Sequence, residues 1–230
     1  MARIVIWGGG PYHPYKEQSR FLREKLSALG HDVAYGESRE TLKAESLTKA
    51  DLLVMMGLDW SAQVKAGPEA WEDPATRKTS YTPLEPEYLK AILDHARAGK
   101  PQFWLHASLV SFEDSPELTE ILDGRWVEGR SNHPPLHEFP VAARHPDHPL
   151  MKGVSNFRVA DELYTGLNNP MKSDILLESF YEGAWRPLAW AREDGGRRMA
   201  YLGLGHDMNV YAHPMFQKML FNGFEWLLKE

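Results

Sequence analysis

Residues 101–108 read Pro-Gln-Phe-Trp-Leu-His-Ala-Ser and predict a short buried strand that stops at His106. The apolar run over residues 103–105 is typical of a strand that is covered on both faces of a parallel sheet. A helical spacing of apolar residues precedes it over residues 86–99. This order of helix, buried strand and sharp turn is the repeating unit of an open α/β sheet.

The same unit recurs on both sides of this segment. Alternation of strands with helices in the first half predicts right-handed crossovers and a parallel sheet, whereas the closely spaced apolar runs of the second half predict antiparallel strands. The expected strands are residues 3–7, 32–35, 51–56, 101–105, 159–165, 174–181, 186–191 and 199–204. The expected helices are residues 15–29, 86–99, 115–122 and 214–228, and the proline-rich segments 61–85 and 129–149 are expected to be irregular.

Length and composition indicate one globular domain over residues 1–230. With 43% hydrophobic and 25% charged residues, the chain holds enough apolar material for a full core. Its formal charge of −6 gives no broad attraction for phosphate backbones or anionic lipid, so we expect neither a nucleic acid nor a membrane as partner. No apolar stretch reaches the roughly 20 residues of a membrane span, and the run over residues 4–7 is too short for a signal peptide.

The chain contains no cysteine. Disulfides, thiolate metal sites and a cysteine nucleophile are therefore excluded, and a cytoplasmic location is expected. An apolar excursion between Trp60 and Trp71 offers a surface through which a homo-oligomer could form.

A glycine-rich loop, Gly8, Gly9 and Gly10, follows the first strand and precedes a helix, as phosphate-binding loops do. Its spacing matches neither G-x-G-x-x-G nor G-x-x-x-x-G-K-[ST], and Pro11 removes a backbone donor that a phosphate cradle would use. We therefore expect no nucleotide cofactor and a tight turn at the rim of a pocket.

Functional side chains are expected where the strands end, because ligands of open α/β sheets bind in the crevice at the carboxyl ends of the strands. His106 and His206 both end apolar runs, and Glu162 belongs to an Asp-Glu pair in a strand-like segment whose alternation directs one carboxylate to each face. We assign His106, Glu162 and His206 as candidate catalytic residues and as candidate ligands of a divalent metal such as zinc. The residues expected to line the same cleft and bind the substrate are Asp59, Trp60, His13, His133 and Tyr164.

The sharpest structural prediction is that His106 and His206 converge, although 100 residues separate them. Both rings should point into one pocket with the Glu162 carboxylate. Their polar atoms should be poorly satisfied by the protein alone, as is common for groups that await a ligand.

Two other patterns carry weaker signals. His133 and His137 have the four-residue spacing of zinc helices, but two prolines between them bar an ordinary helix. Ser108 and Ser111 lie close to His106, yet no G-x-S-x-G elbow surrounds them, so helix capping or backbone hydrogen bonding is expected of both. A serine hydrolase is the least favoured hypothesis for this chain.

Several short segments at the expected strand ends and turns carry a family resemblance. They are residues 104–108, 111–112, 122–126, 148–149, 161–164, 195–197 and 204–206. Through them the chain resembles the ThuA-like, or trehalose-utilisation, family of the class I glutamine amidotransferase-like fold. The resemblance covers residues 100–228 well and the N-terminal hundred residues at the level of fold.

This resemblance implies a flavodoxin-like three-layer α/β/α sandwich, with a mostly parallel sheet and some antiparallel strands in the C-terminal half. Amidotransferases of this fold place a cysteine at the strand-to-helix elbow, where this chain has His106, so glutaminase chemistry is not implied. The family is linked to the catabolism of trehalose and related keto-sugars, which implies a small carbohydrate as ligand. A Gly-His-Pro segment of the family lies near His133 of this chain and implies a place for this histidine in the site.

The leading hypothesis is a sugar-metabolising enzyme with a cleft built on His106, Glu162 and His206. These side chains fit two mechanisms: a divalent metal with open coordination positions, or proton transfer on a sugar hydroxyl or on an α-carbon beside a carbonyl. The alternative is a non-catalytic sugar-binding or scaffold module with the same fold and cleft, because a fold alone does not confer a function.

Overall fold

The structure is a computed structural model that describes residues 1–229. Within this range, nine strands form one sheet in the order β2-β1-β3-β4-β9-β8-β7-β5-β6. The strands are β1 (Arg3–Trp7), β2 (Asp32–Gly36), β3 (Leu52–Met55), β4 (Gln102–Leu105), β5 (His137–Ala143), β6 (Phe157–Asp161), β7 (Asp174–Tyr181), β8 (Ala184–Asp194) and β9 (Arg197–Leu202).

The first half of the sheet is parallel, as predicted. β2, β1, β3, β4 and β9 all run in the same direction. Trp7 pairs with Met55, and Met55 pairs with Trp104, so these strands end at a common edge of the sheet. Every residue of β3 and β4 is buried, which explains why their sequences are continuous apolar runs and do not alternate.

The second half, from β9 through β8 and β7 to β5 and β6, is antiparallel. The expectation that residues 129–149 are irregular is wrong for β5, which alternates between buried Phe139 and Val141 and more exposed neighbours. Pro140 lacks a backbone donor, but it lies where β5 pairs with β6 alone, and pairing with β7 begins only at Ala142. A proline is tolerated at such a position.

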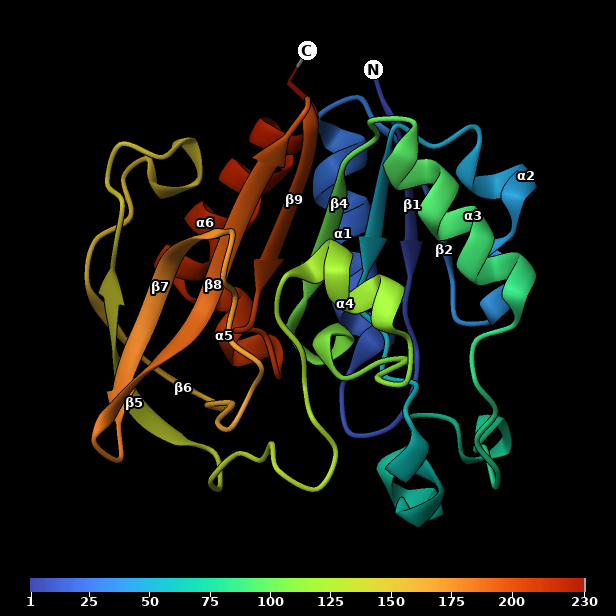
Figure 1. The fold of residues 1–230 in the computed structure, drawn as a ribbon, viewed down its shortest axis with the longest axis horizontal. Coiled ribbons are helices and arrows are strands. Elements are labelled where there is room, and N and C mark those ends of the chain that lie inside the picture. Colours follow the sequence, from blue (N-terminus) through green and yellow to red (C-terminus); the bar gives the residue numbers. More distant parts are fainter. Residues whose placement is uncertain (230) are drawn as a thin grey trace.

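Helices cover both faces of the parallel half. Figure 1 shows α3 and α4 in front of the sheet and α1 and α6 behind it, which gives the expected three-layer arrangement. The helices are α1 (Tyr15–Ala28), α2 (Ala44–Leu47), α3 (Pro86–Arg97), α4 (Pro116–Leu122), α5 (Met208–Ala212) and α6 (Pro214–Leu227). Ser115 caps α4 by accepting a hydrogen bond from Leu118 N, as its sequence predicts.

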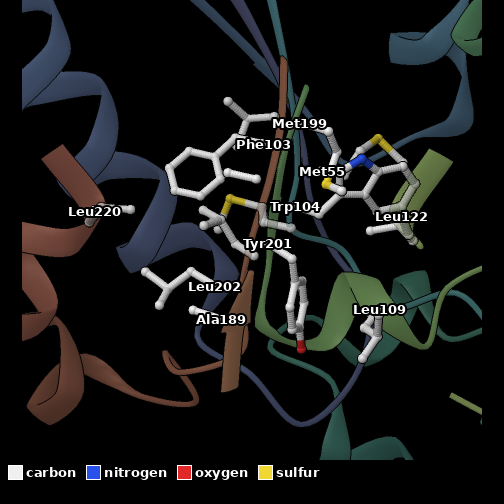
Figure 2. Packing of buried hydrophobic residues seen from close by; sticks show 14 of the residues in the cluster. Met55, Phe103, Trp104, Leu109, Leu122, Ala189, Met199, Tyr201, Leu202 and Leu220 are labelled. Atoms are coloured by element: carbon white, nitrogen blue, oxygen red, sulfur yellow. The ribbon is translucent and has the colours of Figure 1, made fainter. Parts of the chain in front are cut away.

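The core lies on both sides of the sheet. Figure 2 shows Phe103 and Leu202 beside Leu220 of α6, whereas Trp104 points to the other face, toward Leu122 of α4. All five side chains are buried. Alternation along β4 therefore fills two separate helix–sheet interfaces from adjacent residues.

The proline-rich excursion over residues 61–85 contains three short 3-10 turns, Ser61–Lys65, Pro68–Ala70 and Pro74–Thr76. An isolated antiparallel bridge between Trp71 and Pro11 joins it to the loop that follows β1. Trp71 is buried there, so its indole is not part of an exposed apolar surface, and a homo-oligomer through this excursion stays a prediction. No helix within residues 1–229 is long and apolar enough to span a bilayer.

Candidate functional site

A cavity of about 400 Å³ opens beyond the carboxyl ends of β1, β4 and β9. It contains most of the residues that the sequence predicts for the site. Its lining includes His13, Trp60, His133, Glu162, Tyr164 and His206, together with Tyr12, Leu58, Val110 and Trp126. The buried His106 ring contacts three of these residues, His13, Glu162 and Tyr164.

His106 occupies the elbow where β4 ends. Its backbone has a φ of +45°, a left-handed conformation that is uncommon for a residue with a side chain. Its Nδ1 lies 2.7 Å from the carbonyl oxygen of Gly203, which can only accept a hydrogen bond. This contact assigns the proton to Nδ1 and directs Nε2 toward Tyr164 and Glu162, each 3.3 Å away.

Two adjacent carboxylates serve the site from the end of β6. The strand ends at Asp161, so the predicted strand over residues 159–165 is too long at its carboxyl end. Asp161 is buried and accepts hydrogen bonds from the backbone N–H groups of Gly205 and His206, at 2.8 and 3.2 Å. Glu162 follows the strand and directs its carboxylate into the cavity.

The loop that carries His206 is held from both sides. Asp161 binds its backbone N–H groups, and Gln18 of α1 donates to the carbonyl oxygens of Gly205 and His206, at 2.9 and 3.2 Å. His206 Nδ1 lies 3.2 Å from Glu162 Oε1, although the two groups are not aligned as a hydrogen bond. Gln18 has no sequence signal for this role, because it belongs to the ordinary buried side of an amphipathic helix.

His13 comes from the loop between β1 and α1. Its Nδ1 lies 3.0 Å from the carbonyl oxygen of Pro11, which again assigns the proton to Nδ1. Its Nε2 is buried and has no hydrogen-bond partner. The His13 ring lies 4.9 Å from the His106 ring and 4.9 Å from the His206 ring, between centroids.

The predicted convergence of His106 and His206 is confirmed, with ring centroids 5.8 Å apart. The expectation of unsatisfied polar atoms holds for His206 Nδ1 and His13 Nε2, but it is wrong for His106, whose two nitrogens both have neighbours. The reason is that a buried histidine can be oriented by a carbonyl on one side while its other nitrogen still faces the cavity.

Four side chains together offer a set of metal ligands. One ligand atom from each of His13, His106, Glu162 and His206 can be chosen so that all lie within 4.8 Å of one another. In a tetrahedral zinc site with bonds of about 2.0 Å, ligand atoms are about 3.3 Å apart. Two contacts of Glu162 have that length, from Oε2 to His106 Nε2 at 3.3 Å and from Oε1 to His206 Nδ1 at 3.2 Å, although they involve different carboxylate oxygens. Sequence analysis assigned His13 to substrate binding and missed it as a fourth candidate ligand.

The ionisation of Glu162 and His13 suits metal binding, whereas the raised pKa of His106 favours an imidazolium, which must lose its proton before it can bind a metal. Burial disfavours a charge on Glu162, but the close imidazoles of His106, His206 and His13 outweigh burial and hold the pKa of this carboxyl well below its usual range. Burial also lowers the pKa of His106, whereas Glu162 and Asp161 raise it to a net value above the usual one. Burial and the neighbouring His106 lower the pKa of His13 to about 3. An anionic carboxylate and a neutral imidazole are the forms that bind a metal.

Aromatic and polar groups line the wall and the rim of the cavity. Tyr164 stacks on His106 with ring centroids 5.1 Å apart, and Trp126 lies edge-on to Tyr164 at 5.4 Å. His133 is 39% exposed and places its Nε2 3.6 Å from Glu162 Oε1, so it lies at the entrance. Trp60 completes the lining. Four of the five predicted substrate-binding residues therefore line one cavity: His13, Trp60, His133 and Tyr164.

Asp59 is not brought into this cavity. Its carboxylate accepts hydrogen bonds from Arg39 and Gln63, both at 2.9 Å, and pairs with Lys78. These partners lie on a second cavity beside the first. The position of Asp59 after β3 predicts the correct edge of the sheet, but the direction of its side chain depends on the loop that follows.

The other candidates lie outside the ligand set. His137 directs its ring toward Phe139 and Tyr181, away from His133, so the two histidines do not form a zinc helix. Ser111 donates a hydrogen bond to Gly57 O, at 2.7 Å, and accepts one from Asp59 N. Ser108 is buried without a hydrogen-bond partner for its hydroxyl. Neither serine is activated by a histidine, which disfavours the serine hydrolase hypothesis.

Comparison with known families agrees with this architecture. The sequence profile of the ThuA family, described as trehalose utilisation, matches residues 3–227. The chain belongs to the ThuA family. The match begins near the N-terminus of the chain, so the family resemblance extends well beyond the segments after residue 100 that carry it in the sequence. No curated protein matches the chain.

Solved structures share the fold of this ThuA protein at low sequence identity. A ThuA-like protein from Parabacteroides merdae is 20% identical, with a TM-score of 0.72 over 99% of this chain and 90% of that one. A Salmonella typhimurium protein described as cytoplasmic is 16% identical, with a TM-score of 0.65 over 98% of both chains. A glutamine amidotransferase from Thermotoga maritima is 11% identical, with a TM-score of 0.57 over 100% of this chain and 99% of that one. These likenesses establish the amidotransferase-like fold.

Proposed function

We propose that this ThuA protein is a metal-dependent enzyme of sugar utilisation that acts on trehalose or a related keto-sugar. His13, His106, Glu162 and His206 would hold a divalent ion such as zinc. The observation that supports this proposal most directly is that four chain segments, each following a strand, bring three imidazoles and one carboxylate together in a largely buried cluster. Imidazole and carboxylate ligands suit zinc and other first-row divalent metals.

Unpartnered atoms in the cluster support the fit. His13 Nε2 and His206 Nδ1 have no hydrogen-bond partner although both are buried, and such atoms are costly unless a ligand satisfies them. His13 and His106 are each oriented by a backbone carbonyl at Nδ1, the arrangement that is common for metal-binding histidines. A divalent ion there would supply Lewis acidity toward a hydroxyl or carbonyl oxygen of the substrate.

The residues around the cluster have separate tasks in this proposal. Trp60 and Trp126 offer apolar ring faces to a sugar and help to exclude water. The Tyr164 hydroxyl and the His133 imidazole lie within 3.3 Å of His106 and 3.6 Å of Glu162, respectively, where they can hold or move a proton of a sugar hydroxyl.

Metal analysis tests the proposal. The protein is purified without added metal and analysed by inductively coupled plasma mass spectrometry, beside Glu162→Ala, His206→Ala and the control His137→Ala, whose histidine lies outside the cavity. We expect close to one equivalent of metal in the wild type and in the control, and loss of that metal in the two site variants. Metal-free wild-type protein that still turns over a sugar would replace this proposal with proton transfer by Glu162 and His106, which are 3.3 Å apart.

The rival hypothesis is a sugar-binding module without catalysis. It is tested by incubating the protein with trehalose, other disaccharides and their keto derivatives, followed by product analysis. Turnover that is lost in Glu162→Ala supports the enzyme, whereas binding without any product across the panel supports the module. We further propose a cytoplasmic location, in line with the absence of cysteine and with the description of the Salmonella typhimurium relative in fold.

A further inference from the structure

Asp59 lies between two residues that line the site cavity of about 400 Å³, although its own carboxylate is outside that cavity. Leu58 and Trp60 both belong to the cavity lining, whereas Asp59 is buried elsewhere. Trp60 is also the last residue before the proline-rich excursion over residues 61–85. The position of Trp60 in the cavity wall therefore depends on how the chain is held at Asp59.

Four hydrogen bonds fix the Asp59 carboxylate. Arg39 donates two of them, from Nε to Oδ2 at 2.9 Å and from Nη2 to Oδ1 at 3.2 Å. Gln63 donates to Oδ1 at 2.9 Å, and Lys78 donates to Oδ2. Burial raises the pKa of Asp59, but Arg39 and Lys78 outweigh burial and lower it below its usual value, so the carboxylate is anionic. The Arg39 and Asp59 side chains are 11% and 3% exposed, and loss of one partner from such a buried pair is costly.

The same guanidinium also holds the far end of the excursion. Arg39 donates to the carbonyl oxygens of Thr82 and Pro83, at 2.8 and 3.1 Å. It also donates to the Glu85 carboxylate, at 3.0 Å. One side chain thus joins Asp59, before the excursion, to the last residues of the excursion, and a loop whose ends are fixed has fewer conformations. A lysine cannot make this set of contacts, because an ammonium lacks the planar fork of donors.

The backbone of Asp59 is joined to the elbow loop that follows β4. Asp59 N donates to Ser111 Oγ at 2.9 Å, and Phe112 N donates to Asp59 O at 2.8 Å. Trp60 itself has weaker support. Its side chain is only partly buried, and its aromatic neighbour Tyr12, at 6.3 Å between ring centroids, is 51% exposed. Asp59 is therefore the anchor from which Trp60 extends into the cavity wall.

We propose that Arg39 and Asp59 form a positioning clamp that holds Trp60 in the wall of the site cavity and thereby sets the affinity of the cavity for its substrate. Neither clamp residue lines that cavity, so both act through Trp60 and do not touch the substrate. The effect on affinity rests on the proposed function, because it takes the site cavity as the place where the substrate binds. The position of Trp60 is measurable without any ligand.

Fluorine NMR of the full-length protein labelled with 5-fluorotryptophan measures that position. The Trp60 resonance is identified by its loss in Trp60→Phe. Trp126, which also lines the site cavity, is identified in the same way by Trp126→Phe and serves as an internal reference.

Two variants test the clamp, and two serve as controls. Arg39→Lys keeps the charge and removes the fork, and Lys78→Met removes a partner of Asp59 that is 40% exposed, so folding is not at risk. Arg144→Lys is the matched control, because Arg144 forms an ion pair with Glu178 in the antiparallel half of the sheet. Leu220→Val, in the core beneath α6, controls for a general loss of stability.

We expect Arg39→Lys to move the Trp60 resonance toward that of free 5-fluorotryptophan and to increase its solvent isotope shift, because the indole leaves the cavity wall. Lys78→Met should move it in the same direction by a smaller amount. The Trp126 resonance and the metal content should stay unchanged. A Trp60 resonance that stays in place in every folded test variant, or that moves equally in Arg144→Lys or Leu220→Val, would overturn the clamp.

Turnover of trehalose supplies a second measurement. Arg39→Lys should raise KM about tenfold with kcat within about twofold, because a displaced wall weakens binding but leaves the candidate metal ligands in place. In a Trp60→Ala background the same substitution should have no further effect, since substitutions that act through one residue are not additive. Additive effects of Arg39→Lys and Trp60→Ala would overturn the proposal. A wild type that does not turn over trehalose would count against the proposed function, and the fluorine resonances alone would then decide the clamp.

Discussion

At the scale of single residues, His106 combines an unusual backbone with a functional side chain. Its φ of +45° would cost less in glycine, so the histidine is retained at an energetic cost of the kind that is commonly found at functional sites. The same elbow position holds the cysteine in amidotransferases of this fold. In this chain the elbow residue is a histidine, and its Nε2 lies 3.3 Å from Glu162. The imidazole is a candidate metal ligand or base, at the position where those amidotransferases have a nucleophile.

Replacing His106 separates function from stability. We expect His106→Ala to abolish metal binding and activity, while the lost hydrogen bond to Gly203 O costs about 1–2 kcal/mol and lowers Tm by a few degrees. Leu105→Ala, one residue earlier and also buried, should cost about 2–5 kcal/mol and retain the metal. Calorimetry with metal analysis checks both variants. A His106→Ala chain that fails to fold would show that His106 has a structural role in the core.

Asp161 acts as a positioning residue for the His206 loop. Gly205 N and His206 N donate to different oxygens of Asp161, so Asp161→Asn keeps the shape but presents an NH₂ group to one of these two backbone donors. We expect metal affinity to fall about 10- to 100-fold and stability to fall by about 2 kcal/mol. Competition titration with a chelating dye measures the affinity, with exposed Asp174→Asn as the control. Unchanged affinity in Asp161→Asn would show that the loop holds its shape without this carboxylate.

At the scale of secondary structure, helix α3 carries a buried histidine with no role in the site. His95 is 4% exposed, and neither ring nitrogen has a hydrogen-bond partner. Burial, with a smaller contribution from Lys100, lowers its pKa from 6.5 to about 4. The helix therefore packs on the molecule only while this imidazole is neutral.

This property of α3 predicts a pH dependence of stability. Below pH 6.5 the unfolded chain binds a proton at His95, whereas the folded chain does so only near pH 4, so acidification through this range favours unfolding. The loss reaches about 3 kcal/mol at pH 4. His95→Leu should reduce the slope between pH 6.5 and pH 4, as measured by urea unfolding at several pH values. Parallel curves for the wild type and His95→Leu would contradict this assignment.

At the scale of the whole molecule, the candidate ligands join the two halves of the sheet. His13 and His106 follow β1 and β4 in the parallel half, whereas Glu162 follows β6, the last strand of the antiparallel half. His206 follows β9, where the two halves meet. A metal bound there would crosslink segments that span most of the chain.

We therefore expect metal to stabilise the entire fold. Binding to the native state alone adds about 2.7 kcal/mol when free metal is present at 100 times its Kd, which raises Tm by about 5–10 °C for a chain of this size. Differential scanning calorimetry with zinc, and then with excess EDTA, measures the shift. Glu162→Ala should show no such shift, and an equal shift in that variant would assign the stabilisation to adventitious surface binding.

Local sequence patterns were sufficient for the order of the elements and for much of the site. Buried runs such as β3 and the periodic spacing of α3 identify strands and helices because burial and periodicity are properties of neighbouring residues. The rule that ligands bind at the carboxyl ends of parallel strands predicts His106 and His206 at one edge of the sheet. Strand β5 is not predicted, because Pro140 cannot donate a backbone hydrogen bond and fits a strand only where β5 pairs with β6 alone.

Only the tertiary structure decided which side chains meet. His13 lies in a loop without periodicity, so nothing local directs its Nε2 toward His106 and His206; the carbonyl of Pro11 does so. Asp59 also lies beyond the carboxyl end of a strand, β3, yet Arg39 and Gln63 bind its carboxylate in the second cavity. Local sequence determines where a strand ends, but the direction of a side chain beyond that end depends on partners from distant segments, and those partners are assembled only when the chain folds.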